Sequence, residues 1–225
     1  ESRSELKKLR DQLAASRKAA PAMYPIAHTI AEGKIEDMKV FARGNPANQR
    51  ELAPRRFLRV LAGDDRPLFT QGSGRLELAT AIANPKNPLT PRLMVNRIWQ
   101  HHFGRGIVAT PSNFGKLGEA PTHPELLDYL ADRFLKSGWS IRLIHREIML
   151  SATYRASTQA AEANANIDAD NRWLWRMNRR RLDVEAWRDA LLDVSGRLDR
   201  TMGGASTNLA DAGNVRRTVY AKISR

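Results

Sequence analysis

The sequence contains no cysteine among its 225 residues. Disulfide bonds, thiolate metal sites and haem attachment through a Cys-x-x-Cys-His motif are therefore excluded within this segment. It also has no apolar run near the length of a membrane span, so no transmembrane segment is expected, and no charged-then-apolar leader. Because the chain begins with Glu rather than Met, we expect a fragment or a processed product.

Familiar catalytic motifs are also missing. The sequence has no Gly-x-Ser-x-Gly nucleophile elbow and no Walker loop. Gly104-Arg105-Gly106 lacks the preceding strand and following helix of a dinucleotide fingerprint, so we interpret it as a helix stop followed by a bend. The acidic residues Glu119, Asp128 and Glu147 do not have the spacing of a recognisable catalytic or ligand pair. The sequence leaves open whether the protein is an enzyme.

Positive charge, by contrast, is abundant. Lysine and arginine number 37 against 24 acidic residues, which gives a formal net charge of +13. This excess favours an anionic partner, such as nucleic acid, an acidic glycan or an anionic membrane surface. Arginine outnumbers lysine, and its planar fork suits carboxylate, sulfate and phosphate groups. A GC-rich codon usage would produce the same arginine bias.

Hydrophobic periodicity predicts a mainly α fold, a helical domain with helical hairpins, a small antiparallel β-sheet and an N-terminal helical arm. Alternating apolar residues predict short strands around Ile26–Ile30 and Met38–Ala42, and a final strand in 216–225 that could pair with them. Thr90, Thr122 and Ser140 are predicted helix N-caps, and Gly104 and Gly138 are predicted stops. The expected helices cover 4–18, 75–84, 91–103, 124–137, 141–152 and 184–198, and a further helix is expected after Pro54.

Three segments follow from these patterns. We expect a helical arm over residues 1–20 and a connecting region with a short β-hairpin over 21–74. The helical domain then covers residues 75–225.

The adjacent histidines at 101 and 102 are the sharpest local feature. Neighbouring helical residues point about 100° apart, so the two cannot easily bind one metal ion, and no metal site is expected. His102 lies on the apolar stripe and is interpreted as a core histidine bonded to a carbonyl. His101, with Arg97 one turn earlier and Asn96 nearby, could hold an anionic group or act in acid–base catalysis.

Two further histidines lie on predicted helices. His123 falls at a helix start, where free amides favour an anion, so a site formed with His101 and Arg97 is a coherent hypothesis. The alternative is that His123 only shapes the opening turn. His145 lies on the apolar stripe of its helix and is expected to be packed or hydrogen-bonded. His28 has no evident partner.

Residues 172–181, with the sequence RWLWRMNRRR, form the densest basic patch. Arginines interleaved with aromatic rings suit sugar acids or nucleic acid. Alternatively, Trp173 and Trp175 anchor the core while the arginines extend past them to water. A DNA-binding role for the hairpin at 122–152 is disfavoured, because its second helix offers only Arg142, Arg146 and Arg155 as basic candidates.

Four ordered stretches carry a family resemblance: NPLTPRLMVNRIWQHHFGRGIV, PTHPELLDYLADRFLKSGWSIRLIHREIMLSATYR, NRWLWRMNRRRLDVEAWRDALLDVSGRLD and RRTVYAKISR. Together, over roughly residues 75–225, they resemble the planctomycete-specific domain of unknown function that ends many large exported planctomycete and verrucomicrobial proteins. AHTIAEGKIEDMKVFARGNPANQRELAPRRFL resembles the connecting region that precedes it. The resemblance implies a periplasmic or cell-envelope setting, an upstream partner domain and, further upstream, a cytochrome-c-like module. It implies no established reaction, and haem c only outside this segment.

The sequence thus predicts a domain of an exported multidomain protein that acts on or binds anionic, carbohydrate-related material in a redox-linked system. Candidate catalytic residues are His101, Arg97 and His123, and candidate substrate-binding residues are Asn96, Arg105, Arg179 and Arg180. No cofactor is expected within the segment. The alternatives are a structural module that packs on the upstream domain and, third, nucleic-acid binding by the basic surface.

Overall fold

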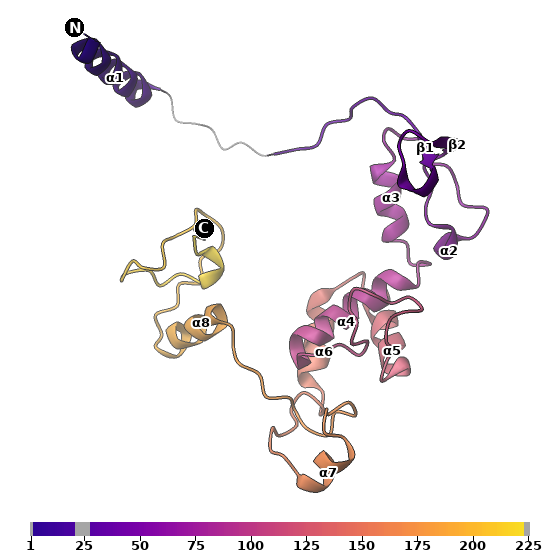
Figure 1. Ribbon diagram of the computed structural model, residues 1–225. Helices are drawn as coiled ribbons and strands as arrows, with labels where there is room; N and C mark the ends of the chain where they lie inside the picture. Colours follow the sequence, from indigo (N-terminus) through magenta and orange to yellow (C-terminus); the bar gives the residue numbers. More distant parts are fainter. Residues whose placement is uncertain (1, 21–27, 223–225) are drawn as a thin grey trace. The chain divides into compact units, whose positions relative to one another are not determined.

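The computed structural model describes residues 2–20 and 28–222, and for Ser2 the backbone alone. The chain divides into two compact units, Glu1–Ala81 and Ile82–Arg225 (Figure 1). The predicted fold class is confirmed: the protein is mainly α-helical with a small antiparallel sheet and an N-terminal helix. Within the described ranges, no helix combines the length and the apolar character needed to cross a membrane.

The first unit contains the N-terminal helix and the sheet. α1 covers Ser2–Ala19, and its apolar stripe of Leu6, Leu9 and Leu13 is exposed. Strands β1 (Met38–Phe41) and β2 (Gln49–Ala53) pair antiparallel around a tight turn, in which Arg43 adopts a left-handed conformation with φ 51°.

The predicted strands had mixed outcomes. The strand around Met38–Ala42 is confirmed as β1, and its partner β2 was not predicted. The earlier strand is wrong over 28–30, which have no regular structure, and Ile26 lies outside the described residues. Two short helices follow in this unit, α2 (Arg59–Ala62) and α3 (Arg75–Ile82).

The core of the second unit is a packed group of three helices: α4 (Leu89–Phe103), α5 (Pro124–Lys136) and α6 (Ile141–Leu150). Each helix presents an apolar stripe to the other two, as the i, i+3, i+4 spacing predicts. Trp99 stacks on Phe103 within α4, with ring centroids 4.1 Å apart. The buried apolar residues are Val95, Ile98, Trp99, Phe103, Ile107, Val108, Leu127, Leu130, Ala131, Phe134, Ile144 and Ile148.

Most of the predicted helix ends are found. Gly104 ends α4 in the left-handed conformation, with φ 84°, and Gly138 follows α5 with φ 68°. Ser140 caps α6, because its Oγ accepts the Leu143 amide at 3.3 Å. The Thr122 cap is wrong: His123 is the N-cap of α5, and the Thr122 hydroxyl and amide both donate to the Ile107 carbonyl.

The start of α4 also differs from the prediction. The helix begins at Leu89 rather than after Thr90, and Asn87 Oδ1 accepts the Leu89 amide at 3.1 Å. The Thr90 hydroxyl donates back to the Ile82 carbonyl at 2.8 Å. Thr90 therefore ties the helix start to the preceding segment instead of capping it.

The remainder of the second unit contains α7 (Glu162–Ile167), α8 (Val184–Val194) and a 3-10 helix at Thr218–Tyr220. The predicted final strand is wrong over the described residues 216–222. That segment forms the 3-10 turn and two isolated parallel bridges, Asp199 to Arg216 and Thr207 to Ala221. Residues 223–225 lie outside the described part.

α8 contacts the rest of the unit through a polar face and not through its apolar stripe. The Asp189 carboxylate accepts the Thr218 amide and hydroxyl at 2.8 and 2.6 Å, and the Arg188 guanidinium donates to the carbonyls of Asn214 and Arg216. A polar face is thus the one bonded to the C-terminal segment. Of the predicted stripe, Val184, Trp187, Leu191 and Val194 are exposed, Trp187 at 56%. Leu198 is half-buried, and the predicted end of the helix at 198 is wrong because α8 ends at Val194.

Candidate functional site

The two histidines at the end of α4 have different surroundings. His101 is exposed, whereas His102 is half-buried and faces α6. The difference follows from the helix geometry, because successive side chains leave the axis about 100° apart. The prediction that one metal ion does not bind both histidines stays a prediction.

His102 and His145 form a hydrogen-bonded pair between α4 and α6. The His102 Nε2 and His145 Nδ1 atoms are 2.6 Å apart, and the rings meet edge to face with centroids 4.9 Å apart. Tyr154 contacts the His102 ring from a third side, with centroids 5.4 Å apart. The prediction that His102 bonds to a carbonyl is therefore wrong: its partner is another imidazole. His145 is hydrogen-bonded, as expected.

The surroundings of His102 disfavour its charged form. Burial is the largest cause that lowers its pKa below 6.5, and the neighbouring His145, Arg180 and His101 lower it further by repulsion. Within the described ranges no group of three or more metal-ligating side chains occurs.

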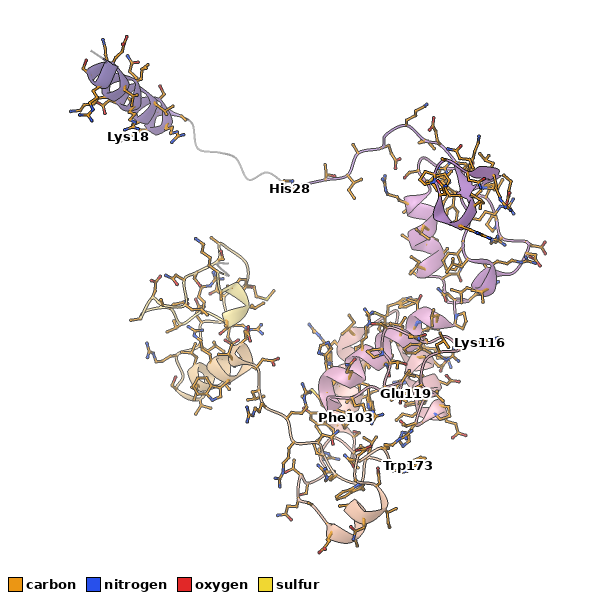
Figure 2. All side chains as sticks on the ribbon, in the orientation of Figure 1. Lys18, His28, Phe103, Lys116, Glu119 and Trp173 are labelled. Atoms are coloured by element: carbon orange, nitrogen blue, oxygen red, sulfur yellow. The ribbon has the colours of Figure 1, made fainter. Side chains whose placement is uncertain are left out.

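A segment from the basic patch covers the C-terminal end of α4. The Asn178 side-chain amide donates to the Phe103 carbonyl at 3.0 Å, and the Arg180 guanidinium donates to the His101 carbonyl. Phe103 lies at this end of the helix in Figure 2. The last carbonyls of a helix have no partner within it and carry partial negative charge, so a cation and an amide donor stabilise them.

This segment and the end of α4 enclose a hollow of about 540 Å³, which we call the α4 hollow. Its cationic groups come from three consecutive arginines, and Asp183 is its one carboxylate. The His102 ring forms part of its wall, while His145 lies behind that ring. The lining residues are His101, His102, Tyr154, Thr158, Met177, Asn178, Arg179, Arg180, Arg181, Leu182, Asp183 and Ala186.

The α4 hollow brings together three of the predicted site residues, His101, Arg179 and Arg180. Arg97 is exposed one turn before His101 and is not among the lining residues. Arg105 lies apart from the hollow and pairs with Glu119, at 3.4 Å between Nη2 and Oε2.

His123 lies elsewhere. Its Nδ1 is 2.9 Å from the Thr122 hydroxyl, and its ring meets Trp173 with centroids 5.6 Å apart. No contact found among the described residues joins His123 to His101 or Arg97. The contacts of His123 agree with the alternative interpretation, in which it shapes the opening turn of α5.

Asn96 is fully buried, and the backbone of Val108 bonds to both polar atoms of its side chain. Its Nδ2 donates to the Val108 carbonyl at 3.0 Å, and its Oδ1 accepts the Val108 amide at 2.9 Å. The side chain thus mimics a strand partner for Val108 and holds the loop after α4. Asn96 therefore has a structural task, and its predicted part in substrate binding stays a prediction.

The two tryptophans of the basic patch have separate positions. Trp173, labelled in Figure 2, is 66% exposed, and its ring contacts that of His123. Trp175 is half-buried, and its Nε1 donates to the Asp168 carbonyl at 3.0 Å. The Arg176 guanidinium lies over the Trp175 ring, 5.0 Å from its centroid. The core-anchor hypothesis fails for Trp173, and the residues of the patch that pack against the core are Leu174 and Met177 rather than Trp175.

A second hollow, of about 560 Å³, lies between α5 and α6 and was not predicted. The Arg133 Nε donates to Glu147 Oε1 at 2.8 Å across it. The three acidic residues considered earlier each face an arginine: Glu119 faces Arg105, Asp128 faces Arg92 and Glu147 faces Arg133. They support the fold as ion pairs rather than forming a carboxylate pair.

Taken with the fold, the α4 hollow defines a helical module with a cationic depression at one helix end. The model of a protein family described as a protein of unknown function (DUF1553), PSD1, matches residues 74–225. The chain belongs to this family, which confirms the resemblance to a domain of unknown function. Neither a curated protein nor a solved structure matches the chain.

Proposed function

We propose that the α4 hollow binds an anionic group, the carboxylate or sulfate of carbohydrate-related material. The observation that carries this proposal is the presence of three consecutive arginines, Arg179–Arg181, in one hollow with His101 and His102. Arginine donates paired hydrogen bonds that match the geometry of carboxylate and sulfate oxygens.

The arginines have different tasks in this proposal. Arg180 is fixed by its bond to the His101 carbonyl, which gives the hollow a wall with a defined position. Neither Arg179 nor Arg181 forms an ion pair with a carboxylate among the described residues. Their charges are available to a ligand, and Asp183 offsets only one of them. A hollow of about 540 Å³ is in the size range of small-ligand sites.

The setting of the proposal comes from the family resemblance. We propose that the chain is one domain of an exported, cell-envelope protein that packs beside an upstream domain, with any haem c on a further module. In this setting the hollow would recognise uronate or sulfated units of a polysaccharide. His101, exposed at the rim, is the residue placed to exchange a proton with such a ligand.

The test is binding of the full chain to a heparin-derived disaccharide, an oligogalacturonide and a neutral chito-oligosaccharide, measured by calorimetry at fixed ionic strength. We expect the two anionic probes to bind and the neutral one not to bind. The Arg179→Ala/Arg181→Ala double variant should weaken binding by about tenfold or more, because two charge-assisted contacts are lost.

A matched control separates the hollow from general polycation behaviour. The double variant Arg10→Ala/Arg17→Ala removes the same charge from exposed positions on α1 and should change the affinity by less than about twofold. Equal losses in both double variants would overturn the proposal. Equal, salt-sensitive binding to heparin and DNA would also contradict it, and a preference for one DNA sequence would support nucleic-acid recognition instead.

A second candidate function, a module that packs on another domain, is favoured by α8. Its apolar residues repeat at intervals of three and four, as in the seam of a helix pair, and they are exposed. Replacing Trp187 and Leu191 by Gln tests this function in the longer polypeptide. Weaker association between the domains, at unchanged folding of this chain, is the expected result, and unchanged association would refute it.

A further inference from the structure

We propose that the His102–His145 pair takes up a single shared proton below neutral pH and that this charge tightens the hold of the α4 hollow on its anion. This inference rests on the proposed function and adds its regulation. The observation behind it is a hydrogen bond between the two imidazole rings. One of these rings, that of His102, lines the hollow.

The short bond limits how many protons the pair can hold. With both rings neutral, one nitrogen donates its hydrogen to the other across the 2.6 Å gap. One additional proton leaves that arrangement intact, because a single hydrogen still lies between the two nitrogens. A second would place two N–H groups face to face, so the bond would break. The bonded pair therefore has two states, neutral and singly charged, and the charge belongs to the pair.

The groups around the pair come from four parts of the chain. α4 contributes His101, and α6 contributes His145 itself. Among the charged residues of α6, Glu147 faces Arg133, Arg146 lines the second hollow and Arg142 is exposed. Tyr154 contacts the His102 ring. The segment that covers α4 contributes Arg179, Arg180 and Arg181 with Asp183.

These neighbours make the pair responsive to an anion. Burial lowers the pKa of His102, and repulsion from the positive groups around it lowers that pKa further, so its neutral form is favoured. An anion between the arginines removes part of that repulsion and favours proton uptake. By linkage, proton uptake increases anion affinity to the same degree.

The experiment measures the dissociation constant of a heparin-derived disaccharide, and of inorganic sulfate, for the full chain at pH 8.0 and pH 5.5. We expect about threefold to tenfold tighter binding at the lower pH. An added positive charge a few ångströms from the anion strengthens binding by about this factor when the effective dielectric constant is high. The double variant His102→Gln/His145→Gln keeps hydrogen-bonding side chains but removes both rings that could carry the proton. It should lose most of the ratio between the two pH values.

Two further variants identify the titrating group. His123→Gln removes a histidine outside the hollow and should keep the full tightening. His101→Gln removes the exposed histidine that also lines the hollow, so it should remove a part of the ratio between the two pH values and leave the part that the His102–His145 pair supplies. If His101→Gln abolishes the ratio and the His102→Gln/His145→Gln double variant retains it, the proposal is overturned.

A ligand-free measurement keeps this inference separate from the proposed function. The ring carbon-bound protons of His102 and His145 can be followed by NMR against pH without any probe. We expect both rings to move together through one midpoint, and independent midpoints would refute the shared proton. If no probe binds at any pH while the rings still titrate together, the proposed function has failed and the shared proton stands.

Discussion

Asn96 on α4 holds both backbone polar groups of Val108, twelve residues later in the chain. The two bonds lie in the buried core, where no water replaces them. They fix the path of the loop between α4 and α5. An amide that sequence patterns suggested for ligand binding therefore has a structural task.

Replacing Asn96 by Leu should destabilise the chain by about 2–4 kcal/mol, because the Val108 amide and carbonyl would be buried without partners. The free energy of unfolding in urea measures this loss. Arg97→Ala, at the exposed neighbouring position, is the control and should cost less than about 0.5 kcal/mol. Equal stability of the two variants would contradict the assigned role.

Gly106 lies beside the same bond and leaves no room for a side chain. A Cβ there would lie 2.5 Å from the Val108 carbonyl oxygen and 2.7 Å from Asn96 Nδ2. Gly106→Ala should therefore cost about 1–3 kcal/mol, measured by chemical unfolding. Gly213→Ala, where a Cβ meets nothing within 4 Å, should be neutral or slightly stabilising. A neutral Gly106→Ala would show that the loop can shift.

The two tryptophans of α4 and α8 should differ in their effect on stability. Trp99 is 5% exposed and stacked on Phe103, so Trp99→Ala should cost about 3–5 kcal/mol. Trp187 is 56% exposed, so Trp187→Ala should cost less than about 1 kcal/mol. Thermal and urea unfolding of both variants measure the difference. A large loss at Trp187 would indicate that its face is covered in the isolated chain.

The pH dependence of stability should report the neutral His102. Its folded-state pKa is lowered from 6.5, so the unfolded chain binds the proton more readily. The stability that the neutral His102 contributes is fully present above pH 6.5. It is lost as the pH falls below 6.5 toward the folded-state pKa. We expect the free energy of unfolding to decrease between pH 7 and pH 5, and to decrease less in His102→Gln. The same slope in both proteins would contradict the assignment.

The acidic residues give a separate pH window. Hydrogen bonds from Arg92 are the main cause that lowers the pKa of Asp128, and burial opposes them. The carboxylate contributes stability above its ordinary value of 3.8, and that stability is lost as the pH falls below it. Measurements between pH 7 and pH 5 therefore isolate the histidine effect.

The parts of the fold that the sequence predicted are those governed by local rules. The stripes of α4, α5 and α6 and the stops at Gly104 and Gly138 depend on residues within a few positions of one another. The cap at Thr122 failed because its hydroxyl and amide both donate to the carbonyl of Ile107, fifteen residues earlier. The exposed stripe of α8 could not be foreseen, because periodicity identifies an apolar face but not what covers it.

The candidate site was predicted in part for the same reason. Both His102 and His145 were recognised as inward-facing, yet their pairing depends on how α4 and α6 cross, which no local pattern encodes. The basic patch at 172–181 was visible in the sequence, but its position at the end of α4 was not. The available signal was two inward-facing histidines on two helices, α4 and α6, of one packed group.

The stretch that walls the α4 hollow also terminates the helix, since Asn178 and Arg180 bond to its final carbonyls. If the α4 hollow binds an anion as we propose, a molecule that immobilises Arg180 should also restrain the last turn of α4. We then expect slower deuterium uptake at the Gly104 amide, which donates to the Gln100 carbonyl. Backbone exchange would report the bound molecule even when that molecule itself gives no signal.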